Sequence, residues 1–151
     1  MMSVGELCNR NVATVSAHTP IADATALMRH HHVGDVVVVN LIGGRPLPLG
    51  VITDRDILIE VMSQEIPNAL EPVIGDLITR EPVCIASHRS LFDAIETMRN
   101  HAVRRLPVVD SEGGLIGIVT ADDMLRVLSR ALAELAAIGE RQRHRETETR
   151  P

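Results

Sequence analysis

A pattern of glycine, two apolar residues, threonine, two further residues and aspartate occurs twice, at residues 50–56 and 117–123. Where a strand turns into a helix, this spacing places a hydroxyl and a carboxylate beside free backbone N–H groups. The carboxylate can accept both hydroxyls of a ribose, through charge-assisted hydrogen bonds of roughly 1.5–3 kcal/mol each. The same pattern is also typical of a capping box, which starts a helix without any ligand. Both interpretations stay open from the pattern alone.

Two adjacent arginines are further candidates for ligand chemistry. Arg104 and Arg105 each carry a rigid fork of hydrogen-bond donors that suits a phosphate group. The alternative is a solvated turn in front of a buried strand. From the residues alone, neither interpretation is preferred.

The sequence contains no pattern that predicts a metal site or a catalytic centre. His30, His31 and His32 are consecutive, so they do not face one another on a helix and cannot converge on one ion. Cys8 and Cys84 lie far apart without CxxC spacing, which favours two reduced thiols. Since no paired acid and base and no nucleophile elbow are found, we expect no enzyme and no enzyme cofactor.

The two Thr-x-x-Asp patterns belong to two copies of one unit. Residues 4–39 align with residues 74–109 without a gap, and the match resumes at Gly50 and Gly117 after a three-residue slip. The changing apolar periodicity of each copy predicts a strand, a helix, two strands joined by a glycine turn, and a closing helix. The predicted elements, in pairs, are strands 13–15 and 83–85, helices 21–28 and 91–98, strands 36–39 and 106–109, strands ending at 52 and 119, and helices 54–62 and 121–138.

These elements divide the chain into repeat 1 (residues 1–62), a linker (63–73), repeat 2 (74–138) and a charged flexible tail (139–151). The last helix carries an apolar stripe formed by Leu128, Leu132, Leu135 and Ile138. Such a stripe must be buried. It packs either on its own domain or across a dimer.

Composition narrows the classes of partner. The chain has 151 residues with 45% apolar and 23% charged, which is typical of one globular unit or two packed halves. The net charge of −5 disfavours direct nucleic-acid binding, and Phe92 is the only aromatic residue on which a base could stack. Neither a secretory signal nor a membrane-spanning run is seen, so we expect a cytoplasmic protein.

The repeat resembles a tandem pair of CBS (cystathionine-β-synthase) domains, a Bateman module. The resemblance rests on the ordered segments 82–85, 91–94, 103–110 and 117–120, and it covers residues 4 to about 128. It implies an α/β (α+β) fold in which two repeats of strand-helix-strand-strand-helix type pack as a pseudo-twofold pair. It also implies two clefts between the repeats that bind adenosine-containing ligands, and modules that pair into a flat disc.

The resemblance implies a first cleft with a ribose clamp, a base slot and a phosphate-binding position. These are, in turn, Thr53 and Asp56; Val51, Pro82, Val83 and Cys84; and Arg104 and Arg105. We expect AMP-like ligands at this site.

The second cleft would use the matching residues of the other repeat: Thr120 and Asp123 for ribose, Ile118, Val12, Ala13 and Thr14 for the base, and Asp35 and Arg55 at the phosphates. Asp35 would repel a phosphate, and Arg55 would only partly offset it. Asp122 is the equivalent of Arg55 in the other repeat, so it would face the phosphates of the first cleft and weaken that site. The sequence therefore predicts two unequal sites.

These residues predict a stand-alone regulatory module that signals through an unknown downstream protein or through its own homodimer. AMP is the expected ligand, and ATP, ADP, NAD and S-adenosylmethionine are further candidates. The alternative hypothesis is a structural dimerisation or adaptor protein whose clefts are vestigial and whose Thr-x-x-Asp patterns serve only as caps.

Overall fold

The computed structural model describes residues 2–63 and 72–150 as two similar halves. The first half contains α1 (Val4–Leu7), β1 (Thr14–Ser16), α2 (Ile21–His31), β2 (Asp35–Ile42), β3 (Arg45–Thr53) and α3 (Asp54–Met62). The second half contains η1 (Ile74–Leu77), β4 (Ile85–Ala86), α4 (Leu91–His101), β5 (Arg105–Val109), β6 (Leu115–Thr120) and α5 (Ala121–Thr149). The predicted order of strand, helix, strand, strand and helix is confirmed in both repeats.

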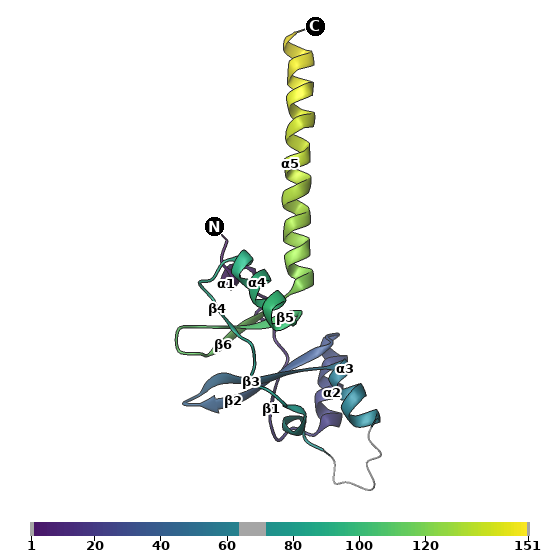
Figure 1. Cartoon of the computed structure of the whole chain (residues 1–151), viewed down its shortest axis with the longest axis vertical. Helices are drawn as coiled ribbons and strands as arrows, with labels where there is room; N and C mark the ends of the chain where they lie inside the picture. The colour runs from purple at the N-terminus through teal and green to yellow at the C-terminus, as the bar shows by residue number, and fades with distance from the viewer. Residues whose placement is uncertain (1, 64–71, 151) are drawn as a thin grey trace.

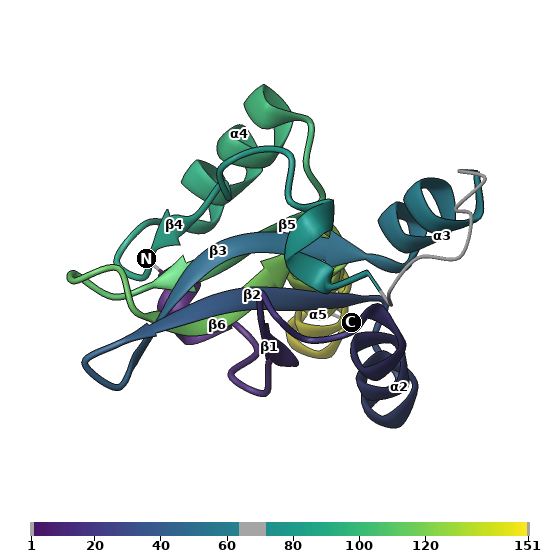
Figure 2. The same ribbon diagram turned by 90° about the horizontal axis from the view of Figure 1, so that it is seen from below.

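Each repeat forms a three-stranded mixed sheet, with strand orders β1-β2-β3 and β4-β5-β6. The first strand pairs in parallel with the second across a helical crossover, and the hairpin pairs antiparallel. The two sheets lie against each other (Figures 1 and 2). Val37, Val39 and Ile118 are buried between them, so the inter-sheet contact is aliphatic.

The two repeats exchange their N-terminal segments. Val4 of the first segment is fully buried in the core of the second repeat, and Ile74 is fully buried in the core of the first. Backbone hydrogen bonds hold both ends in place, from Gly5 N–H to Ser87 O and from Gly75 N–H to Ala17 O, each at 2.9 Å. Each repeat therefore completes the core of the other.

Glycine is required where each exchanged segment approaches its host. A Cβ atom on Gly5 would lie 2.9 Å from the Ser87 carbonyl oxygen, and one on Gly75 would lie 2.7 Å from that of Ala17. Real Cβ atoms do not approach backbone oxygens this closely. Neither α1 nor η1 was among the predicted elements, because a single helical turn has too few residues to show a period.

The last helix differs from the prediction. The sequence predicts a helix that ends at 138 and a flexible tail, whereas α5 continues to Thr149. The residues after Gly139 include no proline before 151 and carry pairs at helical spacing, such as His144 with Glu148, which support a helix. Among the described residues, no helix is long and apolar enough to cross a bilayer.

Most of the predicted linker lies outside the described residues. The two described residues at its end, Pro72 and Val73, lie against the start of α2. Ile21 N–H donates to Pro72 O at 3.1 Å, and Val73 forms an antiparallel bridge with Pro20. The chain is thus tied to the first repeat directly before η1 enters its core.

Truncation of Ile74 tests the exchange of segments. Ile74→Ala should lower the free energy of unfolding by about 2–5 kcal/mol, because it leaves a cavity in the core of the other repeat. Leu58→Ala, at a side chain that is 61% exposed, is the matched control and should change it by less than about 0.5 kcal/mol. Urea unfolding followed by circular dichroism measures both, and equal losses would contradict the exchange.

Candidate functional site

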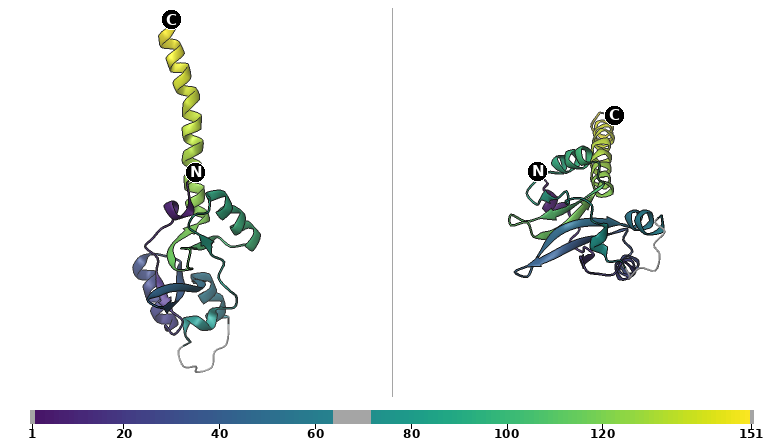
Figure 3. Two further views of the ribbon diagram at one scale, coloured as in Figure 1. Left: turned by 90° about the vertical axis from the view of Figure 1, so that its left-hand side faces the viewer. Right: turned by 60° about the horizontal axis from the view of Figure 1, so that its bottom comes forward.

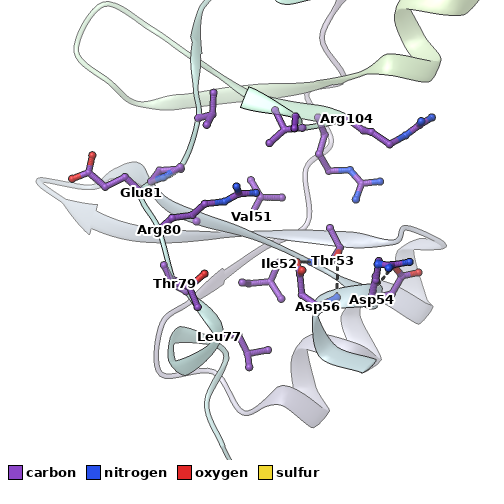
Figure 4. A pocket seen from close by; sticks show the side chains of 18 residues that line it. Val51, Ile52, Thr53, Asp54, Asp56, Leu77, Thr79, Arg80, Glu81 and Arg104 are labelled. Atoms are coloured by element: carbon purple, nitrogen blue, oxygen red, sulfur yellow. Dashed lines mark hydrogen bonds between the residues drawn. The ribbon is translucent and has the colours of Figure 1, made fainter. Parts of the chain in front are cut away.

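A cavity of about 610 Å³ opens beside the junction of β3 and α3 (Figure 4). Its walls are residues 50–56, residues 77–83 from the last residue of η1 onward, and residues 102–105 up to the first residue of β5. The cavity therefore takes its lining from both repeats. Its volume falls within the range of roughly 300–1,000 Å³ that is usual for small-molecule sites.

Thr53 and Asp56 form a complete capping box at the start of α3. Asp56 N–H donates to Thr53 Oγ1 at 3.1 Å, and Thr53 N–H donates to Asp56 Oδ2 at 2.8 Å. No donor to Asp56 Oδ1 is found in the described part of the chain. The cap and the ribose clamp are therefore compatible, because one carboxylate oxygen closes the helix and the other, on a residue that lines the cavity, has no donor among the described residues.

The equivalent pair in the second repeat is more fully engaged. Asp123 Oδ2 accepts from Thr120 N–H at 2.9 Å and from Thr120 Oγ1 at 2.8 Å. Arg126 Nη2 lies 2.6 Å from the other oxygen, Oδ1. The position of Arg126 is occupied in the first repeat by Ile59, which cannot donate a hydrogen bond. Both oxygens of Asp123 thus have partners within the chain.

The outer edge of β6 is also occupied. Asn9 pairs with Ile118 through two backbone hydrogen bonds of 2.9 Å, one in each direction. A Cβ atom on Gly117 would lie 2.5 Å from Cys8 Sγ, so this strand accepts the chain only because glycine precedes Ile118. The N-terminal segment therefore covers the sheet edge at which a ligand of the second cleft would lie.

The matching edge of β3 is open. Val37 pairs with Val51 and donates its own N–H to Ala13 O on the β1 side, at 2.9 Å. Val37 and Val51 are therefore a non-hydrogen-bonded pair of the antiparallel ladder, in which the backbone groups of the two residues point away from each other. The N–H and C=O of Val51 thus point to the free edge of β3. Thr79 stands where Asn9 stands in the other repeat, and within residues 2–63 and 72–150 no backbone bond joins it to Val51.

The lining of the cavity contains more positive than negative side chains. The positive residues are Arg55, Arg80, Arg104 and Arg105, and the negative residues are Asp54, Asp56 and Glu81. Arg104 pairs with Asp122 of α5 at 3.2 Å, and both side chains are largely exposed. In the described residues, the guanidinium groups of Arg55 and Arg80 have no carboxylate partner.

Arg105 is held by a carboxylate of the first repeat. Its Nε atom is buried and lies 3.0 Å from Asp35 Oδ2, although the angle is not that of a hydrogen bond. Burial raises the pKa of Asp35, Arg105 opposes this shift, and Asp54 adds to it. Asp35 and Arg105 are equivalent residues of the two repeats, so this ion pair marks the pseudo-twofold axis.

Seven of the eight residues predicted for the first cleft line the cavity. The exception is Cys84, which lies half-buried behind it, where burial raises the pKa of the thiol to about 11. Arg55, which was predicted at the second cleft, lines the first. Its assignment to the second cleft stays a prediction.

The other residues predicted for the second cleft each have a place in the sheets, the core or a helix cap. Val12 and Ile118 pack between the sheets, and Ala13 is buried in the core of the first repeat. Thr14 begins β1, Asp35 pairs with Arg105, and Thr120 and Asp123 cap α5.

The wall formed by residues 77–81 is not part of the predicted site, and it includes Leu77, Arg80 and Glu81. In Figure 4 the Arg80 side chain points into the cavity toward Val51. One signal was available. The match of residues 74–77 with 4–7 indicates a repeated turn, and the segment after that turn becomes the wall.

Comparison with known proteins identifies the family. The CBS domain matches residues 4–63 and 74–130. The CBS domain-containing protein YhcV of Bacillus subtilis is 35% identical over 124 residues, which cover 82% of this chain and 84% of YhcV. An uncharacterized protein of Methanopyrus kandleri, MK0525, is 37% identical over 126 residues, and these cover 83% of this chain and 62% of that protein.

Solved structures show the same fold. The structure of CBSX2 in complex with AMP has a TM-score of 0.71 and 27% identity, and the match covers 87% of this chain and 98% of CBSX2. Hypoxic Response Protein I, solved with two coordinated zinc ions, has a TM-score of 0.70 and 28% identity over 83% of this chain and 98% of that one. The chain described here belongs to the CBS domain family and is a tandem pair of CBS domains.

Proposed function

We propose that this CBS pair is a regulatory module of the cytoplasm that binds AMP in the cavity of the first repeat and passes its occupancy to another protein. The observation that carries this proposal is the contrast between Asp56 and Asp123. Asp56 lines the cavity and has one carboxylate oxygen without a donor among the described residues, whereas Arg126 donates to the equivalent oxygen of Asp123. The similar CBS pair CBSX2 was solved in complex with AMP, which supports an adenine nucleotide as the ligand.

The three parts of AMP fit different walls. The free oxygen of Asp56 is placed to accept the ribose hydroxyls. Val51 and Val83 offer the base an aliphatic surface, and the open backbone groups of Val51 offer one donor and one acceptor to its polar edge. The phosphate would meet the guanidinium groups of the lining, among which Arg55 is unpaired within the described residues.

Arg80 is suited to cover the base. The lining contains no aromatic side chain, and Arg80 reaches from the 77–83 wall toward Val51 (Figure 4). A planar guanidinium can stack on a nucleobase. ADP, ATP, NAD and S-adenosylmethionine share the adenosine part, so they compete for the same walls and differ only at the end that meets the arginines.

The site should bind one nucleotide per chain and depend on Asp56. Calorimetric titration of nucleotide-free protein with AMP should give one site, and Asp56→Ala should weaken it about 10- to 150-fold through loss of the ribose hydrogen bonds. Asp123→Ala is the matched control, because it breaks the equivalent capping box at the start of α5 and should leave the affinity unchanged.

Two results would contradict the proposal. If none of the adenosine ligands binds, the clefts are vestigial and the Thr-x-x-Asp patterns serve only as helix caps. If Asp123→Ala weakens AMP binding as strongly as Asp56→Ala does, binding does not depend on the cavity of the first repeat in particular.

The ion pair between Asp35 and Arg105 should limit phosphate binding. Asp35→Asn removes a negative charge beside the cavity and releases Arg105, so AMP should bind about three- to tenfold more tightly. Adenosine, which has no phosphate, should bind equally to both proteins. Titrations of the two ligands measure this difference, and an equal gain for adenosine would show that Asp35 acts on the fold of the cavity instead.

A further inference from the structure

Helix α5 extends far beyond the module it begins in. Only its first turns pack on the second repeat, through Met124, Val127 and Leu128, and the rest runs away from both sheets (Figures 1 and 3). Four large apolar side chains are left uncovered on it: Leu125 (59% exposed), Leu132 (67%), Leu135 (63%) and Ile138 (59%). An isolated helix with such a surface is unstable in water unless the surface is buried.

The spacing of the leucines is that of a helix–helix seam. Leu125, Leu128, Leu132 and Leu135 alternate steps of three and four residues, which are the a and d positions of a heptad repeat. Three of the residues that flank this seam at e and g positions are small, namely Ser129, Ala131 and Ala136, and Ile138 at the next g position widens the apolar surface. A second helix can therefore approach closely along it.

The charges of α5 distinguish a parallel from an antiparallel arrangement of two α5 helices from two copies of the chain. In a parallel pair, the heptad places Glu146 opposite Glu146 of the second copy and Arg145 opposite Arg150, so like charges meet. In an antiparallel pair with Leu132 opposite Leu135, Arg143 faces Asp122, whose side chain is 71% exposed and also pairs with Arg104 through Oδ1. Gly139 then lies opposite Leu128 and leaves room for it. Charge and shape both favour the antiparallel pair.

We propose that α5 is a self-association surface, on which two copies of this chain pair antiparallel over residues 122–143. The surface is separate from the nucleotide cavity, and the inference does not depend on nucleotide binding. It assigns the uncovered leucines a partner of matching chemistry, which is the same stripe on a second copy.

Sedimentation of the full chain tests the surface. The wild-type protein should associate, and Leu132→Glu should weaken association at least roughly 100-fold, because each pair loses two buried leucines and gains two buried charges. Ala137→Glu is the matched control, since it adds the same charge to the opposite face of α5 and should associate like wild type. A monomeric wild-type chain, or a Leu132→Glu variant that associates normally, would overturn the proposal.

Disulfide cross-linking tests the orientation. In a chain with Cys8→Ser and Cys84→Ser, a mixture of Leu125→Cys and Gln142→Cys proteins should form covalent heterodimers on oxidation. Neither protein should cross-link alone, because the two copies of residue 125 are about 25 Å apart in the antiparallel pair, at 1.5 Å per residue. Efficient self-cross-linking of Leu125→Cys would indicate a parallel pair and overturn the inference.

Discussion

Each CBS repeat of this chain has a core that only the other repeat can complete. Val4 and Ile74 are fully buried, and each lies in the core of the opposite half. This constraint makes the two repeats one cooperative unit, because neither sheet can keep its core closed after separation from its partner's segment. It also builds the cavity, since η1 is anchored by Ile74 and the wall at residues 77–83 follows directly from it.

The duplicated sequence produces two repeats with the same backbone fold and different side chains around their clefts. The two repeats share the capping boxes, the hairpins and the glycines at which each exchanged N-terminal segment approaches the other repeat. Two substitutions between repeats and one difference in backbone pairing then separate their chemistry. Arg126 stands in place of Ile59 and donates to the carboxylate of Asp123, and Asp35 stands in place of Arg105 and forms an ion pair with it. The backbone of Asn9 pairs with the edge of β6, whereas no backbone bond joins the equivalent Thr79 to β3 in the described residues.

The part of this structure that could be predicted depends on local patterns. Apolar periodicity identified the strands and helices, and the Thr-x-x-Asp pattern placed Thr53 and Asp56 correctly at the start of α3. The wall at residues 77–81 escaped prediction because long-range packing, not local sequence, brings it to the cavity. The place of Arg55 in the lining of this cavity was not predicted, for the same reason. The extent of α5 was missed because the apolar stripe ends at Ile138, while charged pairs continue the helix.

Arg104 joins the cavity to α5 twice. Its carbonyl oxygen accepts the N–H of Ala121, the first residue of the helix, at 2.8 Å, and its guanidinium pairs with Asp122. The first residues of α5 thus lie directly beside the cavity, and the rest of the helix projects away from it. At 1.5 Å per residue its 29 residues span about 43 Å. A tilt of roughly 10° at the base of α5 would move its far end by about 7 Å, so a small change in the packing around Arg104 becomes a much larger displacement at the end of the helix.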